Sequence, residues 1–146
     1  MMKKNIKLEA TMDNFKVVSK FVDDLISGNV VDELIHDQII VAVEEIYVNI
    51  AHYAYGQLDE NGDSIPDSGT GPVEVIVSDE NRLVTITFID SGIMYNPLEK
   101  PDPDVTKPPS ERQIGGYGIF MVKKTMDDMT YKYEDNQNIL SFSKKY

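Results

Sequence analysis

The sequence contains no cysteine and only two histidines, His36 and His52. Disulfides and thiolate metal sites are therefore excluded, and a zinc site is not expected with so few imidazole ligands. No apolar run reaches the roughly 18 residues that a membrane-spanning helix needs, and no secretory signal is recognisable at the start. These absences lead us to expect a cytoplasmic protein without a membrane segment.

Basic residues are also scarce, because 14 lysines and arginines against 25 aspartates and glutamates give a formal net charge of −11. Direct binding to nucleic acid is not expected, since a phosphate backbone requires a basic surface. An anionic membrane surface is disfavoured for the same reason. The acidity serves either general solubility or electrostatic complementarity to a basic protein partner.

The pattern of apolar residues predicts an α+β fold. With 146 residues the chain can bury one core, and we expect a single domain over residues 1–146. Period-two alternation predicts strands over residues 4–10, 73–78, 83–89, 129–134 and 139–144. Helical periodicity predicts one helix capped by Thr11, a second from Asp32 to about Tyr55 and a third from Gly116 to Met126. We expect a two-layer sandwich with helices packed on one face of a mixed sheet.

Two long segments lack any periodicity. Residues 57–72 are polar and rich in glycine, aspartate and serine, which predicts an exposed loop. Residues 98–114 are rich in proline, and we expect a mobile loop or lid there. Shorter turns are expected at residues 79–81 and 135–138, where polar residues separate consecutive strands.

Glu45 and Asn49 lie one helical turn apart in the segment VEEIYVNIAHYAY and therefore share a face. A carboxylate and a carboxamide are hard oxygen ligands that suit magnesium. Magnesium keeps several waters and accepts phosphate oxygens, so one or two protein oxygens are sufficient. The same spacing also fits solvated positions on an amphipathic helix, so the pair alone does not decide between the two interpretations.

Asp90 ends a strand in which Val84, Ile86 and Phe88 share its face. A carboxylate at the end of such a stripe is partly buried, and its burial is costly unless it is hydrogen-bonded. The exocyclic amine of a purine is a suitable donor, and Gly92 would let the ring approach the backbone. The alternative is that Asp90 to Gly92 form an ordinary turn after a strand.

Gly115, Gly116 and Gly118 precede the third apolar helix. Glycines at a helix start expose backbone amides and the positive end of the helix dipole to an anion. The spacing matches neither a Walker loop nor a dinucleotide fingerprint. Arg112 lies just before the glycines and is placed to reach a γ-phosphate. A flexible helix start is the alternative interpretation.

In this order, the segments VEEIYVNIAHYAY, DSGIMYNP and GGYGIFMVKKTMDDM resemble the N, G1 and G2 boxes of the GHKL ATPases, which share the Bergerat ATP-binding fold. The likeness covers nearly the whole chain and is greatest to the small anti-sigma-factor serine/threonine kinases. It implies that Asn49 binds the metal and that Glu45 acts as general base. It also implies that Asp90 reads adenine, with Gly92 beside it.

The same resemblance places the phosphates at Gly116 and Gly118. It also places a threonine near adenine on the penultimate strand, where this chain has Leu140 with Ser141 beside it. The implied catalytic roles are proton acceptance by Glu45 and stabilisation of the γ-phosphoryl group by magnesium and Arg112.

The resemblance therefore implies a protein serine kinase that uses ATP and Mg²⁺ and acts as an anti-sigma factor. Its partners would be a sigma factor and an anti-anti-sigma protein with a STAS-like fold, and the chain could form a homodimer. Two alternatives remain open at this point: a nucleotide-dependent anti-sigma binding module without kinase turnover, and an ATPase domain of a histidine-kinase system.

Overall fold

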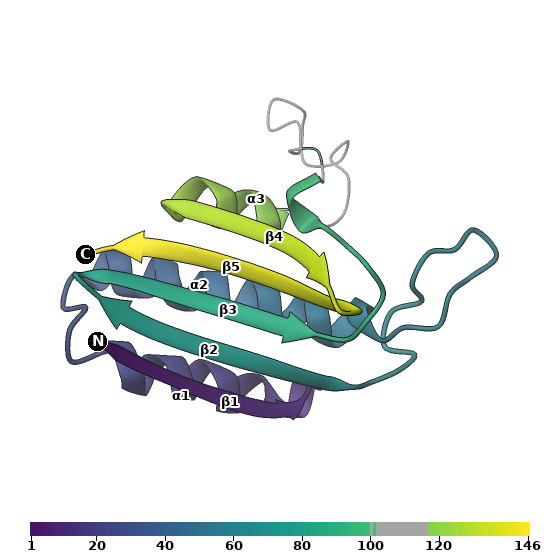
Figure 1. Ribbon diagram of the computed structural model, residues 1–146, viewed down its shortest axis with the longest axis horizontal. Coiled ribbons are helices and arrows are strands. Elements are labelled where there is room, and N and C mark those ends of the chain that lie inside the picture. Colours follow the sequence, from purple (N-terminus) through teal and green to yellow (C-terminus); the bar gives the residue numbers. More distant parts are fainter. Residues whose placement is uncertain (100, 102–116) are drawn as a thin grey trace.

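The computed structural model describes residues 1–99, 101 and 117–146. Five strands form one sheet in the order β1-β2-β3-β5-β4. Their bounds are β1 (Met2–Glu9), β2 (Pro72–Glu80), β3 (Leu83–Asp90), β4 (Asp128–Glu134) and β5 (Gln137–Lys145). Figure 1 shows the sheet as one layer and the helices as a second layer behind it.

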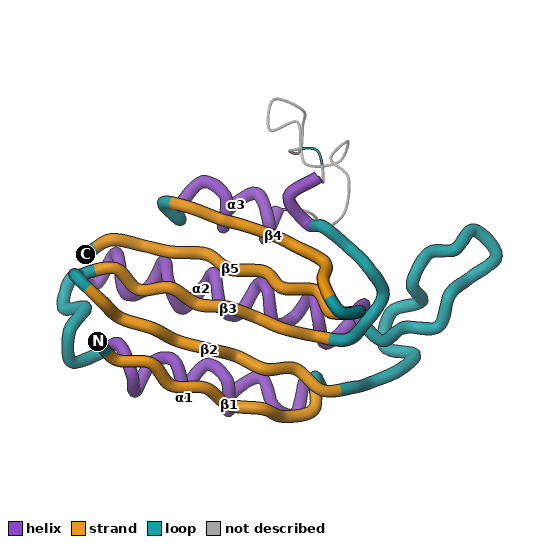
Figure 2. The backbone as a smooth tube through the Cα atoms, in the orientation of Figure 1, coloured by secondary structure: helices purple, strands orange, loops and turns teal. Residues whose placement is uncertain are grey.

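The helices are α1 (Phe15–Ile26), α2 (Glu33–Asn49) and α3 (Tyr117–Thr125), and a π turn, η2 (Ile50–Ala54), continues α2. Short 3₁₀ turns form η1 (Met12–Asn14) and η3 (Pro97–Glu99). In Figure 2 the helices cover one face of the sheet, so the predicted α+β sandwich is confirmed. None of the helices that the structure describes is long and apolar enough to cross a membrane.

All four strand pairings are antiparallel, so the prediction of a mixed sheet is wrong. Asn81 and Arg82 join β2 to β3, and Asp135 and Asn136 join β4 to β5. All four of these residues have φ between 53° and 61°, as in the tight turns that match strand twist. Strands joined by two residues must run antiparallel. The turn predicted at residues 79–81 therefore starts later, because β2 continues to Glu80.

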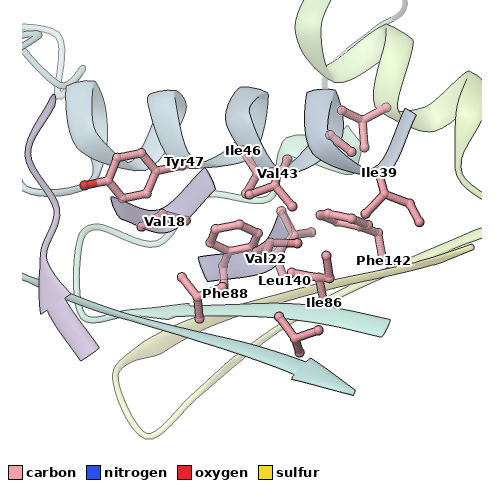
Figure 3. Packing of buried hydrophobic residues seen from close by; sticks show 14 of the residues in the cluster. Val18, Val22, Ile39, Val43, Ile46, Tyr47, Ile86, Phe88, Leu140 and Phe142 are labelled. Atoms are coloured by element: carbon pink, nitrogen blue, oxygen red, sulfur yellow. The ribbon is translucent and has the colours of Figure 1, made fainter. Parts of the chain in front are cut away.

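The core lies between the sheet and the two long helices (Figure 3). It forms because every second strand residue and every third or fourth helix residue is apolar. Burying one such large side chain contributes about 1.5–3 kcal/mol. Figure 3 labels Val18, Val22, Ile39, Val43, Ile46, Tyr47, Ile86, Phe88, Leu140 and Phe142 in this layer.

The start of α2 confirms the helix start predicted at Asp32. A side-chain oxygen of Asp32 accepts a hydrogen bond from the backbone N–H of Ile35 at 3.1 Å, which satisfies one of the unpaired donors at the helix start. Thr11 makes no such bond with its side chain, and η1 comes between it and α1. Its carbonyl instead accepts a hydrogen bond from the Tyr47 hydroxyl at 2.5 Å.

Residues 57–71 form the exposed loop that the sequence predicts, and this insert extends past the end of the sheet in Figure 1. The insert is attached to η2. The N–H of Asp67 donates to the carbonyl of His52 at 2.9 Å, and the Ser64 hydroxyl donates to the carbonyl of Tyr53 at 2.6 Å. The Asp67 carboxylate also pairs with the His52 ring. The insert thus supplies donors to carbonyls that a helix end leaves unpaired.

Candidate functional site

Asp90 is buried where β3 ends, with 6% of its surface exposed. Its Oδ1 accepts hydrogen bonds from the N–H of Gly92 at 2.9 Å and from Nδ2 of Asn138 at 3.0 Å. Burial raises the pKa of the Asp90 carboxyl, and the two hydrogen bonds oppose that rise. Within the described residues its Oδ2 has no hydrogen-bond partner, so that oxygen can accept from a ligand.

Asn138 holds Asp90 in place from the neighbouring strand. The two residues are directly paired across β3 and β5, and Nδ2 of Asn138 also donates to the carbonyl of Ile93 at 2.8 Å. Its Oδ1 accepts from the N–H of Tyr95 at 3.1 Å and from the hydroxyl of Tyr131 at 2.6 Å. A buried amide with this many partners fixes both the carboxylate and the loop that follows it.

Asn138 is not among the site residues that the sequence predicts, because residues 135–138 have the composition of a turn. The turn is formed by two residues, so Asn138 already belongs to β5 and faces the helices like Leu140, two residues later. Leu140 is buried in the core, and Ser141 instead pairs with the hydroxyl of Thr87 at 2.7 Å. The side chain that contacts Asp90 from this strand is therefore Asn138, and neither Leu140 nor Ser141 takes that place. If the hairpin is drawn with a two-residue turn, its register already places Asn138 on the buried face of the strand.

Gly92 lies against the end of η2. A Cβ atom at this position would be 2.1 Å from the carbonyl oxygen of Ala54 and 2.6 Å from its carbonyl carbon. The next residue, Ile93, donates its N–H to the same carbonyl at 2.9 Å. The close packing of Gly92 on the helix end therefore explains why this residue is a glycine, and the approach of a ligand ring is not needed to explain it. We call Asp90, Gly92 and Asn138 the Asp90 cluster.

Glu45 lies on α2 and faces α3. A Cβ atom at Gly118 would be 2.0 Å from Oε2 of Glu45 and 2.8 Å from its Cδ, so the carboxylate is next to the first turn of α3. A negative charge is favourable at a helix start. The adjacent Glu44 points elsewhere, because its carboxylate accepts a hydrogen bond from the hydroxyl of Ser19 on α1 at 3.0 Å.

Asn49 is the last residue of α2 and shares a face with Glu45. Both side chains are half-buried, and neither makes a hydrogen bond or ion pair within residues 1–99, 101 and 117–146. We call Glu45, Asn49 and Gly118 the Glu45 cluster. The structure thus brings Glu45 and Gly118 together, and it joins Asp90 to Gly92 in the other cluster.

The side-chain oxygens of the Glu45 cluster are suitable ligands for magnesium. They are too few for a metal ion that is coordinated by protein ligands alone. In the described residues no group of three histidine, aspartate or glutamate side chains could hold a metal ion. Magnesium needs only one or two protein oxygens when phosphates and waters complete its shell. Asn49 could supply one such oxygen without losing a hydrogen bond to any of the described residues.

A continuous helical segment connects the two clusters. It carries Glu45 and Asn49 and ends at Ala54, which contacts Gly92. Glu45 and Ala54 are nine positions apart, or roughly 13 Å along a helix. The clusters therefore lie at two points along one helical segment, so an elongated ligand lying beside it could contact both.

Several predicted site residues lie outside the described residues. The structure does not describe residues 100 and 102–116, which include Arg112, Gly115, Gly116 and most of the predicted lid. The roles expected for Arg112 and Gly116 therefore remain predictions.

Comparison with known proteins shows the family of the chain. Residues 8–144 match the family of histidine kinase-like ATPase domains. The chain belongs to this family. The predicted family resemblance is therefore confirmed.

The fold is also similar to a solved structure of the RsbU and RsbW domains of Rv1364c from Mycobacterium tuberculosis. The TM-score is 0.63 at 13% sequence identity, and the match covers 99% of this chain and 32% of the other. This ATPase domain thus spans about a third of that chain, and the likeness concerns the fold. Among curated proteins, none matches the chain.

Proposed function

We propose that the chain is an ATP-dependent protein serine/threonine kinase that acts as an anti-sigma factor in the cytoplasm. Its substrate would be a serine on an anti-anti-sigma protein with a STAS-like fold, and its second partner would be a sigma factor. The membership in an ATPase family and the fold shared with a structure that contains an RsbW domain support this proposal. A homodimer is part of the proposal.

The observation that carries the kinase function is the direction of Glu45. Its carboxylate lies beside the start of α3, where exposed amides and the helix dipole favour a phosphate. Glu44 is engaged with Ser19, so Glu45 is the glutamate of the pair that can act there. A protein that only binds nucleotide has no need of a carboxylate at this position.

Each remaining residue has a role that its surroundings permit. The Oδ2 of Asp90 would accept a hydrogen bond from the adenine amine. The carboxamide oxygen of Asn49 would bind magnesium, which when bound neutralises phosphate charge. Gly116 and Gly118 would border the phosphates, and Arg112 would contact the γ-phosphoryl group.

In the proposed reaction, the serine oxygen of the partner attacks the γ-phosphorus of ATP. The carboxylate of Glu45 accepts the proton of the serine hydroxyl as the new O–P bond forms. The bond between the γ-phosphorus and the β,γ-bridging oxygen breaks, and ADP leaves. Most of the rate enhancement in phosphoryl transfer comes from positioning and from charge stabilisation.

The test is transfer of radiolabelled phosphate from ATP to the antagonist that co-purifies with the protein. Glu45→Gln should retain ATP affinity and reduce transfer by about 100-fold or more, which is within the usual range for loss of a positioned base. Glu44→Gln is the matched control and should transfer at close to the wild-type rate. Equal rates for Glu45→Gln and wild type would contradict the mechanism.

Two other results would select the alternatives. Wild-type protein that binds ATP but phosphorylates no bound partner would favour a nucleotide-dependent anti-sigma binding module. Labelling of a histidine, identified by its acid-labile phosphate, would favour a histidine-kinase system.

A further inference from the structure

The side chain of Tyr55 connects three segments that are far apart in the sequence. Tyr55 directly follows η2, and its hydroxyl donates a hydrogen bond to the carbonyl of Pro72, the first residue of β2. The same oxygen accepts the N–H of Ser91 at 2.8 Å. Ser91 lies between Asp90 and Gly92, so the hydroxyl holds the loop of the Asp90 cluster from the side of the helix.

The ring of Tyr55 has little room to move. A Cβ atom at Gly71 would be 2.4–2.6 Å from three ring carbons, so the ring packs directly on that backbone. A Cβ atom at Gly69 would be 2.0 Å from the carbonyl oxygen of Tyr55. Both contacts come from the end of the insert, which thus packs on the ring of Tyr55 at Gly71 and on its backbone at Gly69.

A second set of contacts joins the same loop to the same helix end. Ile93 donates its N–H to the carbonyl of Ala54, and Gly92 packs on the Ala54 backbone. Ala54 and Tyr55 are consecutive. The loop is thus held at Ser91 and at Ile93, on both sides of Gly92.

The Tyr55 hydroxyl is suited to keep both hydrogen bonds at neutral pH. Burial raises its pKa, the hydrogen bond from Ser91 opposes the rise, and the negative charge of Asp90 adds to it. The hydroxyl therefore stays protonated and can donate to Pro72 while it accepts from Ser91.

We propose that Tyr55 is a positioning residue that sets the separation between the loop of Asp90 and the helix that carries Asn49. This inference rests on the proposed nucleotide site. ATP must contact the base-reading carboxylate and the metal-binding amide at the same time, and a fixed separation reduces the entropy lost on binding. Tyr55 acts through Ser91 and the helix end, without touching the nucleotide.

The test compares Tyr55→Phe with Tyr47→Phe. Both tyrosines donate to a backbone carbonyl, but the carbonyls that the Tyr47 hydroxyl contacts are those of Glu9 and Thr11, which are not in the loop that follows Asp90. Calorimetry should show that Tyr55→Phe lowers the affinity for ATP with magnesium by about fivefold to tenfold. The ratio of the affinities for ATP and GTP should fall by a similar factor. Tyr47→Phe should lower the unfolding temperature at least as much and leave both nucleotide affinities unchanged.

Hydrogen exchange in the wild type is an independent measurement that needs no variant. The amides of Ser91 and Ile93 should be protected without nucleotide. Exchange of both amides at the rate of exposed loop amides would overturn the inference, as would wild-type affinity and selectivity in Tyr55→Phe. An equal affinity loss in Tyr47→Phe would also overturn it, since the effect would then be general. Failure of the wild type to bind ATP at all would overturn the proposed function together with this inference.

Discussion

The two ends of the candidate site are built differently. In the Asp90 cluster the carboxylate is buried and Oδ1 has two protein donors. In the Glu45 cluster both polar side chains are half-buried and have no hydrogen-bond partner in the described residues. A buried polar group must find its partners in the protein, whereas a half-buried one can be hydrated until a ligand arrives.

Under the proposed function, this difference means that the end assigned to the base would be organised before binding, and the end assigned to the chemistry would be completed by the ligand. A fixed carboxylate suits selection among purines, because its geometry does not change with the ligand. Within the described residues Glu45 and Asn49 have no hydrogen-bond partner, so Glu45 can accept from a hydroxyl and Asn49 can bind a metal without breaking an existing bond. The substitutions below test this contrast at each end.

Asp90→Asn should have the largest effect on ATP affinity. The variant replaces the acceptor Oδ2 by an amide, so the hydrogen bond to adenine is lost and ATP affinity should fall by about 10- to 100-fold, which corresponds to about 1.5–3 kcal/mol. Calorimetry with ATP and magnesium measures it. Asp79→Asn is the matched control, because Asp79 is also buried and bonded to Asn29 and Tyr146 but lies at the other end of β2. Affinity unchanged in Asp90→Asn would contradict the assignment.

The same variant has an expected effect on stability. The folded pKa of Asp90 is raised above its ordinary value of 3.8, so the native state binds more protons than the unfolded state between those two values. The free energy of unfolding then falls as pH rises through that window. In Asp90→Asn this decrease in the free energy of unfolding should be absent. The variant should therefore be at least as stable as the wild type at neutral pH. Urea unfolding at a series of pH values measures it.

Gly92→Ala should damage the Asp90 cluster by distorting its backbone. The added methyl group meets the backbone of Ala54, which cannot rotate away, so overpacking should cost about 1–3 kcal/mol of stability. Thermal unfolding should show a clear decrease in the melting temperature. An unchanged melting temperature would show that this loop is not fixed to the helix.

Gly118→Ala makes the same change at the other end and should have a smaller effect on stability. The methyl group meets the end of the Glu45 side chain, which can rotate away, so the melting temperature should change little. Phosphate transfer should fall by about tenfold because the displaced carboxylate no longer reaches the hydroxyl. If Gly118→Ala destabilises the protein as much as Gly92→Ala, the two ends do not differ in rigidity.

Much of the fold could be predicted from the sequence. Period-two and helical patterns are strong in the core strands and in α2, and Asp32 marks a helix start by ordinary capping chemistry. The strand directions are harder to predict. Periodicity shows which face of a strand is buried, but it does not show which strand pairs with it or in which direction that strand runs. The two-residue turns with positive φ decide this. Asp135 and Asn136 are typical residues of such turns, whereas Arg82 is not.

The site was predicted in part. Asp90 and Glu45 stand out because a carboxylate in an apolar stripe needs a reason. Asn138 does not stand out, since asparagine near a hairpin is usually a turn residue, and only the pairing of β3 with β5 brings it to Asp90. The link through Tyr55 was also beyond sequence reasoning, because it depends on contacts between Tyr55, Pro72 and Ser91.

The most direct test of the central claim is titration of the wild-type protein with ATP, with magnesium present and again with magnesium removed by a chelator. We expect saturable binding of one ATP per chain, weakened by about tenfold or more without magnesium, because Asn49 then lacks the ion that links it to the phosphates. GTP should bind more weakly than ATP in both conditions. No ATP binding in the presence of magnesium would contradict the account.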